Sequence, residues 1–173
     1  MASATLRPAV PDDAAILADL GARTFRETFE QICSPGDMEA FLEATYGEAI
    51  QRAELLDSSR PALVLEADGA PIGFAQLRMG HREPCITARR PVELQRIYVL
   101  RGSHGGGHGA ALMNRAVELA RDWGADVLWL GVWENNHRAL AFYARNGFRE
   151  VGEHIFKIGD QVDRDLILAK DLP

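Results

Sequence analysis

The chain has 173 residues, of which 47% are hydrophobic and 25% are charged. A chain of this length can form a compact domain with a sizeable core, and the composition is ordinary for a globular protein. The net charge of −6 opposes binding to a phosphate backbone, so nucleic acid is not an expected partner, whereas a cationic substrate would be attracted.

The first half of the chain predicts a strand, then helices, then a hairpin. Proline and acidic residues suit the first turn of a helix, and the apolar residues change from a helical to a strand period after residue 60. In chain order we expect a strand over residues 5–9, helices that begin at Pro11 and at Ser34-Pro35, a helix over residues 49–56, and a hairpin with strands at 63–65 and 72–77 joined by Asp68-Gly69.

The second half interleaves helices with strands. After a loop over residues 81–91, we expect a strand at 92–100, a helix at 110–123, a strand at 127–133, a helix at 137–145 between Asn136 and Gly147, and a closing hairpin with strands at 148–158 and 162–169. This alternation predicts a mixed α/β sheet rather than a helical bundle or a β-sandwich.

The sequence also suggests where the protein is found. No apolar run approaches the ~20 residues that span a bilayer, and the N-terminal residues lack the pattern of a secretory signal. Cys33 and Cys85 lie far apart and fit free thiols in a reducing compartment. We therefore expect a cytoplasmic protein without membrane association, folded as one domain over residues 1–173. A homodimer stays open.

The clearest feature is a run of glycines between a predicted strand and a predicted helix, His104-Gly105-Gly106-Gly107-His108-Gly109, called here the glycine turn. Its backbone N–H groups are unobstructed by Cβ atoms, and the following helix begins with partial positive charge. Such a turn binds phosphate or pyrophosphate. The alternative is a flexible loop without a ligand. Ordering so many glycines costs conformational entropy, and such a loop would have no ligand contacts to offset it. A metal site is not expected, because the glycines preclude a regular helix there and no H-E-x-x-H motif is present.

The glycine turn can be compared with two known nucleotide-binding motifs. A P-loop is excluded, because no G-x-x-x-x-G-K-[ST] occurs. Gly105-x-Gly107-x-x-Ala110 matches the loose dinucleotide fingerprint, with Glu134 near the place of a ribose-binding acid. Too little chain remains around it, however, for a doubly wound sheet.

The surroundings of the glycine turn instead resemble the GNAT family of N-acetyltransferases. Leu94 to Leu100 followed by His104 to Leu112 resembles motif A, although His104 stands where the family usually has Arg or Gln. Asn136-x-x-Ala139-x-x-Phe142-Tyr143-x-x-x-Gly147-Phe148 resembles motif B. The resemblance implies a mostly antiparallel central sheet with a splay between the fourth and fifth strands, flanked by helices. It also implies acetyl transfer from acetyl-CoA to a primary amine by direct attack.

The resemblance assigns the cofactor-binding residues. It implies that the pantetheine arm pairs with Ile97-Tyr98-Val99, with the Val99 N–H facing the thioester oxygen, and that the pyrophosphate lies on the glycine turn. Asn136 could bind the pantetheine or serve only as a helix cap. The residues expected at the coenzyme are Ile97, Tyr98, Val99, His104, Gly105, Gly106, Gly107, His108, Gly109, Ala110, Asn136 and Tyr143.

Acyl transfer to an amine also needs an acid and a base. Tyr143 is the candidate acid for the departing thiolate; the alternative is an aromatic ring in the core. Glu93 is the candidate base, because strand alternation would put it on one face with Gln95, Ile97 and Val99. Glu134 is its rival, and either carboxylate could bind a substrate cation instead.

A narrower resemblance points to an acceptor. Thr24-Phe25-x-x-Thr28-Phe29, Trp129 to Glu134 and Asp165-Leu166-Ile167 are similar to the PaiA-type polyamine N-acetyltransferases, which implies spermidine, spermine or a related amine. Aromatic faces attract ammonium groups, so an acceptor pocket is expected to include Phe25, Thr28, Phe29, Trp133 and Glu134. A protein lysine or N-terminal acetyltransferase and a non-catalytic acetyl-CoA-binding regulatory module stay as alternatives.

Overall fold

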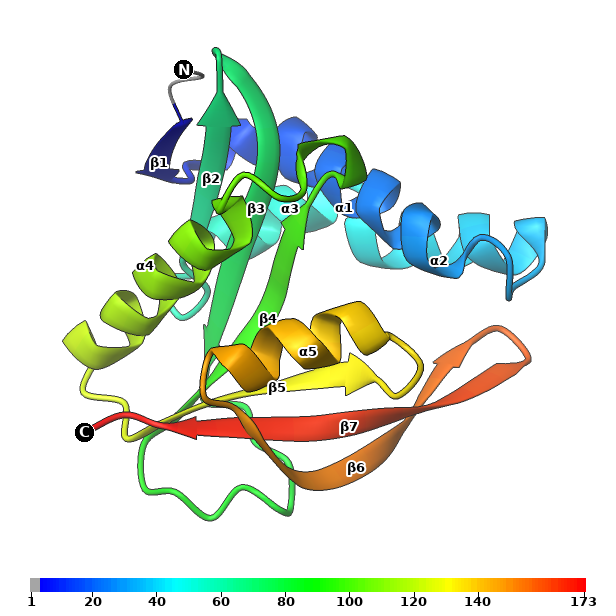
Figure 1. Ribbon diagram of the computed structural model, residues 1–173. Helices are drawn as coiled ribbons and strands as arrows, with labels where there is room; N and C mark the ends of the chain where they lie inside the picture. The colour runs from blue at the N-terminus through cyan, green and yellow to red at the C-terminus, as the bar shows by residue number, and fades with distance from the viewer. Residues whose placement is uncertain (1–3) are drawn as a thin grey trace.

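The computed structural model describes residues 4–173 and contains one seven-stranded sheet with helices on both faces (Figure 1). Among these residues, no helix is long and apolar enough to cross a membrane. The elements in chain order are β1 (Ala4–Pro8), η1 (Pro11–Asp13), α1 (Ala14–Phe29), α2 (Pro35–Tyr46), α3 (Glu48–Leu56), β2 (Ala62–Ala67), β3 (Ala70–Met79), β4 (Pro91–Val99), η2 (Arg101–Ser103), α4 (His108–Asp122), β5 (Val127–Trp133), α5 (His137–Arg145), β6 (Arg149–Ile158) and β7 (Gln161–Asp171).

The predicted elements are found with small shifts at their ends, because local signals set their limits. Ser34 begins α2 by accepting a hydrogen bond from the Asp37 N–H at 3.1 Å, and Asn136 begins α5 by accepting one from Ala139 at 3.2 Å. Gly147 ends α5 at a φ of 83°, in the left-handed region that glycine tolerates. Helix α4 begins at His108, two residues before the predicted start and inside the glycine turn, and α1 begins at Ala14, after the 3₁₀ turn that starts at Pro11.

The sheet has the order β1-β2-β3-β4-β5-β7-β6, and β4 and β5 are its parallel pair. They pair only through Pro91–Val127, Val92–Leu128 and Glu93–Trp129. Beyond these pairs β4 keeps only β3 and β5 keeps only β7, so the strands diverge as Figure 1 shows. We call this wedge the splay. The predicted mixed, mostly antiparallel sheet and its splay between the fourth and fifth strands are confirmed.

Each face of the sheet carries its own core. Helices α4 and α5 cover one face through a cluster that includes Leu112, Ala116 and Tyr143, and we call it the α5 face. Helices α1 and α2 cover the other through a cluster that includes Leu17, Phe25 and Leu42, called the α1 face. A smaller cluster around Trp129 and Ile86 lies beneath the loop after β3.

A bulge in β4 corrects one expectation. The register between β3 and β4 shifts so that Leu77 pairs with Leu94 and Gln76 with Arg96, which leaves Gln95 unpaired. The extra residue reverses the alternation of side chains. Ile97 and Val99 therefore pack on the α5 face with Leu94, and the expectation that Glu93 shares their face is wrong.

Helix α1 packs against α2 at Gly21, where a Cβ would clash with the Tyr46 ring. We expect Gly21→Ala to lower the free energy of unfolding by about 1–3 kcal/mol, because the buried ring would have to move. The control is Gly36→Ala in α2, where a Cβ meets nothing within 4 Å. This change should leave the free energy of unfolding the same or raise it by up to about 1 kcal/mol, since alanine favours helix. Urea unfolding followed by circular dichroism measures both, and equal effects would contradict the prediction.

Candidate active site

The glycine turn presents a row of unpaired backbone donors at the start of α4. Gly105 and Gly107 have φ values of 92° and 77°, which only glycine adopts freely. The N–H groups of residues 105–110 meet no acceptor within residues 4–173, and the first intrahelical bond nearby runs from Ala111 to Gly107. Unpaired N–H groups at a helix N-terminus bind anionic oxygens, so the turn fits a pyrophosphate.

Phe142 joins this turn to α5. A Cβ at Gly109 would lie 3.4 Å from the Phe142 ring, an ordinary contact distance, so α5 packs beside the start of α4. The two halves of the predicted coenzyme site, separated in sequence, therefore lie together on the α5 face. Asn136 serves as the cap of α5, which engages its side-chain oxygen.

The free edge of β4 begins where the pairs with β5 end. The Leu100 N–H bonds the Ile72 carbonyl on β3 at 2.9 Å, and backbone groups alternate in direction along a strand. The N–H and carbonyl groups of Ile97 and Val99 therefore point into the splay. An extended amide-bearing arm can pair with such an edge as an added strand does.

His104 covers part of that edge. Its Nε2 lies 2.7 Å from the Val99 carbonyl oxygen. The residue that departs from the usual Arg or Gln of motif A thus contacts the strand rather than extending away from the turn.

Tyr143 is buried on the α5 face between Phe142 and Phe148. Burial raises the pKa of its phenol well above the ordinary value, and the Tyr98 hydroxyl adds to the shift. The Tyr98 ring packs on the α1 face, so the two tyrosines interact across the splay. The Tyr143 phenol keeps its proton at neutral pH and is available as a donor.

Both predicted carboxylates are held by arginines. Glu93 is buried and its Oε2 lies 2.6 Å from Arg78 Nε. Glu134 at the end of β5 lies 2.7 Å from Arg164, which also binds Glu153. A proton taken up by either carboxylate would break an ion pair.

The aromatic residues predicted for the acceptor lie together on the α1 face. Phe25 stacks on Phe29 with ring centroids 4.5 Å apart, and Phe29 lies 5.3 Å from Trp133. Phe41 and Phe156 complete the cluster, which a reading of separate motifs did not reveal. The Thr28 hydroxyl donates to the Thr24 carbonyl.

A buried charge network beside the splay was also missed. Arg96 donates to Glu54 at 2.5 Å and Gln76 at 2.6 Å, and its guanidinium lies 5.0 Å from the centre of the Tyr46 ring. The Tyr46 hydroxyl lies 3.3 Å from that of Tyr98. The network thus connects α2 and α3 to the strand that borders the splay.

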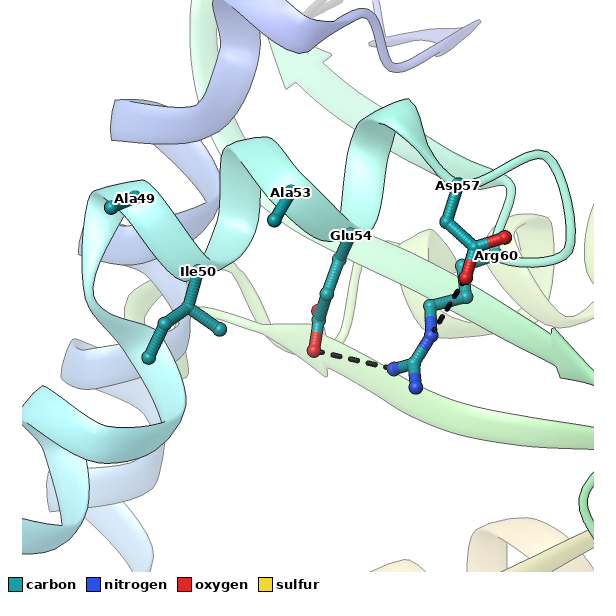
Figure 2. A pocket seen from close by; sticks show the side chains of 6 residues that line it. All are labelled: Ala49, Ile50, Ala53, Glu54, Asp57 and Arg60. Carbon is teal, nitrogen blue, oxygen red and sulfur yellow. Dashed lines mark hydrogen bonds and ion pairs between the residues drawn. The ribbon is translucent and has the colours of Figure 1, made fainter.

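One hollow of the molecule measures about 440 Å³ and follows α3, between Ala49, Ile50 and Ala53 and the ion-paired Glu54 and Arg60 (Figure 2). It includes neither the glycine turn nor the free edge of β4. Within the described residues, no group of three or more His, Cys, Asp or Glu side chains could hold a metal ion.

Other proteins resemble this chain in sequence and in architecture. An N-acetyltransferase of Mycobacterium tuberculosis, itself uncharacterized, is 36% identical over 160 residues, which cover 92% of this chain and 98% of the relative. The PaiA N-acetyltransferase of Thermoplasma acidophilum, solved in complex with coenzyme A, has a TM-score of 0.79 at 22% identity and covers 98% of this chain and 99% of its own.

A Salmonella typhimurium structure described as a putative acetyltransferase with its cofactor acetyl-CoA has a TM-score of 0.70 at 21% identity and covers 99% of this chain and 95% of its own. Residues 23–148 match the acetyltransferase (GNAT) family. The predicted enzyme class and co-substrate are confirmed: the chain belongs to the GNAT family and is an acetyl-CoA-dependent N-acetyltransferase.

Proposed function

We propose that the enzyme transfers the acetyl group of acetyl-CoA to a primary amine of a polyamine, by direct attack within a ternary complex. The observation that carries this proposal is the splay: one strand has a free backbone edge, and unpaired N–H groups stand at its end. The two features match the two ends of one ligand, an amide-containing arm and a pyrophosphate.

The donor is assigned to the α5 face. The N–H groups of residues 105–110 would hold the pyrophosphate, and Ile97 and Val99 would pair with the pantetheine. The Val99 N–H would polarise the thioester carbonyl. His104 and His108 would border the phosphates, and Asn136 would contribute its remaining amide donors.

Tyr143 would act as the general acid. Its phenol retains the proton because burial disfavours the phenolate, and it lies beside the strand that would hold the thioester. A hydrogen bond from this phenol stabilises a departing thiolate as negative charge develops.

The acceptor would enter on the α1 face. Trp133 is only partly buried and offers a face for an ammonium, whereas Phe25 and Phe29 are buried behind it; Thr28 lies next to Phe29 in α1. Glu93 and Glu134 would attract the cation, which is the second of the roles open to them. The net charge of −6 supports a polycationic acceptor.

We expect Gly107→Ala to weaken coenzyme A binding by at least ~10-fold, equivalent to about 1.4 kcal/mol. A side chain at a φ of 77° is strained, so the turn would change shape and its N–H groups would lose their direction. Gly69→Ala is the control, because Gly69 has a φ of 78° and open space around it but lies in the β2–β3 turn. Calorimetric titration should show weaker binding for Gly107→Ala alone, and equal binding by both variants would contradict the assignment.

We expect Tyr143→Phe to lower kcat by about 100-fold or more, since a general acid contributes that much, while the Kd of coenzyme A stays unchanged. Release of free thiol measures kcat, and calorimetry measures Kd. Phe148→Leu, a substitution in the same cluster, controls for loss of packing. An unchanged kcat in Tyr143→Phe would contradict the role of the phenol.

The acceptor class is tested by thiol release with a panel of polyamines, amino acids and lysine peptides. We expect spermidine or spermine to give the highest kcat/KM, because a polycation matches the acidic, aromatic α1 face. Turnover with lysine peptides alone would favour a protein acetyltransferase, and absence of turnover with every polyamine would refute the polyamine assignment.

A further inference from the structure

The α1 face of β5 contains an exposed backbone at Gly131, although its neighbours Leu130 and Val132 are 1% and 6% exposed on the other face. Gly131 lies two positions beyond Trp129, the last β5 residue that pairs with β4, so it borders the splay. A Cβ there would lie 3.5 Å from Asp165 Oδ2 and 3.6 Å from His154 Cε1. The missing side chain leaves a recess floored by Gly131 and walled by Asp165 and His154.

One carboxylate oxygen of Asp165 lacks a hydrogen-bond donor. Its side chain is 14% exposed, and its Oδ1 is buried without a hydrogen-bond partner among residues 4–173. It pairs in register with Trp133, so the carboxylate lies beside the predicted aromatic wall. A buried carboxylate oxygen without a donor is costly, and the second oxygen, Oδ2, faces Gly131, where an ammonium N–H in the recess would meet it.

His154 lies beside this carboxylate. Its Nε2 lies 3.5 Å from Asp165 Oδ2 and its Nδ1 lies 3.2 Å from Glu83 Oε1, and neither contact is a hydrogen bond. Glu83 comes from the loop after β3, and His81 of that loop lies 3.9 Å from the same Glu83 oxygen. The imidazole therefore lies between two carboxylates that come from two other segments of the chain.

Asp165 differs from the carboxylates identified from sequence. Glu93 and Glu134 are each bonded to an arginine, whereas no Lys or Arg pairs with Asp165 within the part of the chain that the structure describes. Its position is also distinct from that of Tyr143, because Tyr143 packs on the α5 face and the recess opens on the α1 face. An amine in the recess would approach the splay from the face opposite the proposed acid.

We propose that Asp165 is the general base of the transfer, that His154 positions it, and that the recess over Gly131 receives the reacting amine. The inference rests on the proposed function, transfer to a primary amine. Asp165 takes one proton from the ammonium and passes it to solvent. The amine nitrogen bonds to the acetyl carbon as the carbon–sulfur bond breaks, Tyr143 protonates the thiolate, and the second proton lost by nitrogen restores the phenol.

The acid–base properties of Asp165 agree with this role. Burial raises its pKa to about 6, opposed by His154 and reinforced by Asp163. Among the neighbouring elements, β5 contributes Gly131 and Trp133, which do not titrate, and Glu83 lies on the far side of His154. The Cys33 thiol lies near Asp163 and also near Asp37. Because the ionised form is the base and exists above the folded pKa, kcat/KM should rise with pH through about 6 and level off above it.

The test compares three proteins, the wild type, Asp165→Asn and Glu153→Gln. The substrate is the amine of the panel that gives the highest turnover with the wild type. Glu153 lies next to His154 in β6 but on the opposite face, where its partner is the exposed Arg164. We expect Asp165→Asn to lose about 100-fold or more in kcat and to lose the rise near pH 6, with the Kd of coenzyme A unchanged. Glu153→Gln should retain both.

Two further variants separate the parts of the proposal. His154→Gln should move the rise in kcat/KM to higher pH and keep most of the plateau, because His154 opposes the increase in the Asp165 pKa. Gly131→Ala should raise the KM for the amine at unchanged coenzyme A affinity, since its Cβ fits without a clash but fills the recess.

The inference would be overturned if Asp165→Asn kept the turnover and the pH profile of the wild type. It would also be overturned if this substitution raised the KM for the amine and changed nothing else. Wild-type turnover with a non-polyamine amine would refute only the polyamine assignment. An independent readout is the carboxyl infrared band that differs between wild type and Asp165→Asn, measured during pH titration. A band that titrates below pH 4.5 would refute the proposed base even if every panel amine were inactive.

Discussion

The feature on which the rest of this protein depends is the point where β4 and β5 stop pairing. Their three shared pairs hold two half-sheets together, and the outer neighbours β3 and β7 then carry the strands apart. Backbone groups inside a protein are almost always paired. The N–H groups of Ile97 and Val99 and the Ile97 carbonyl therefore need a partner with amides of its own, and the GNAT co-substrate is such a partner.

The splay also divides the chemistry between the faces of the sheet. The glycine turn and Tyr143, which are assigned to the donor, lie on the α5 face; Trp133, Asp165 and Gly131, which are proposed for the acceptor, lie on the α1 face. The faces meet only where the strands diverge. This separation suits direct attack, since the nucleophile and the leaving group then occupy opposite sides of the reacting carbonyl.

Sequence reasoning predicted the elements well because local signals control them, as Ser34, Asn136 and Gly147 illustrate. It also located the glycine turn and Tyr143, whose motifs are contiguous. It failed where the outcome depended on strand register. The bulge at Gln95 has no local signature, so Glu93 was placed on the wrong face. His154 and Asp165 meet only because β6 and β7 pair in one particular register, and Arg78 engages Glu93 only across β3 and β4.

An unpaired strand edge is hazardous for any protein, because it is a template on which a strand of another chain can add. Here the exposed edge of β4 lies inside a wedge rather than at the rim of the sheet, and the His104 imidazole occupies the Val99 carbonyl. A strand that added to this edge would have to displace that imidazole, so the replacement of the customary Arg or Gln by histidine also bears on self-association.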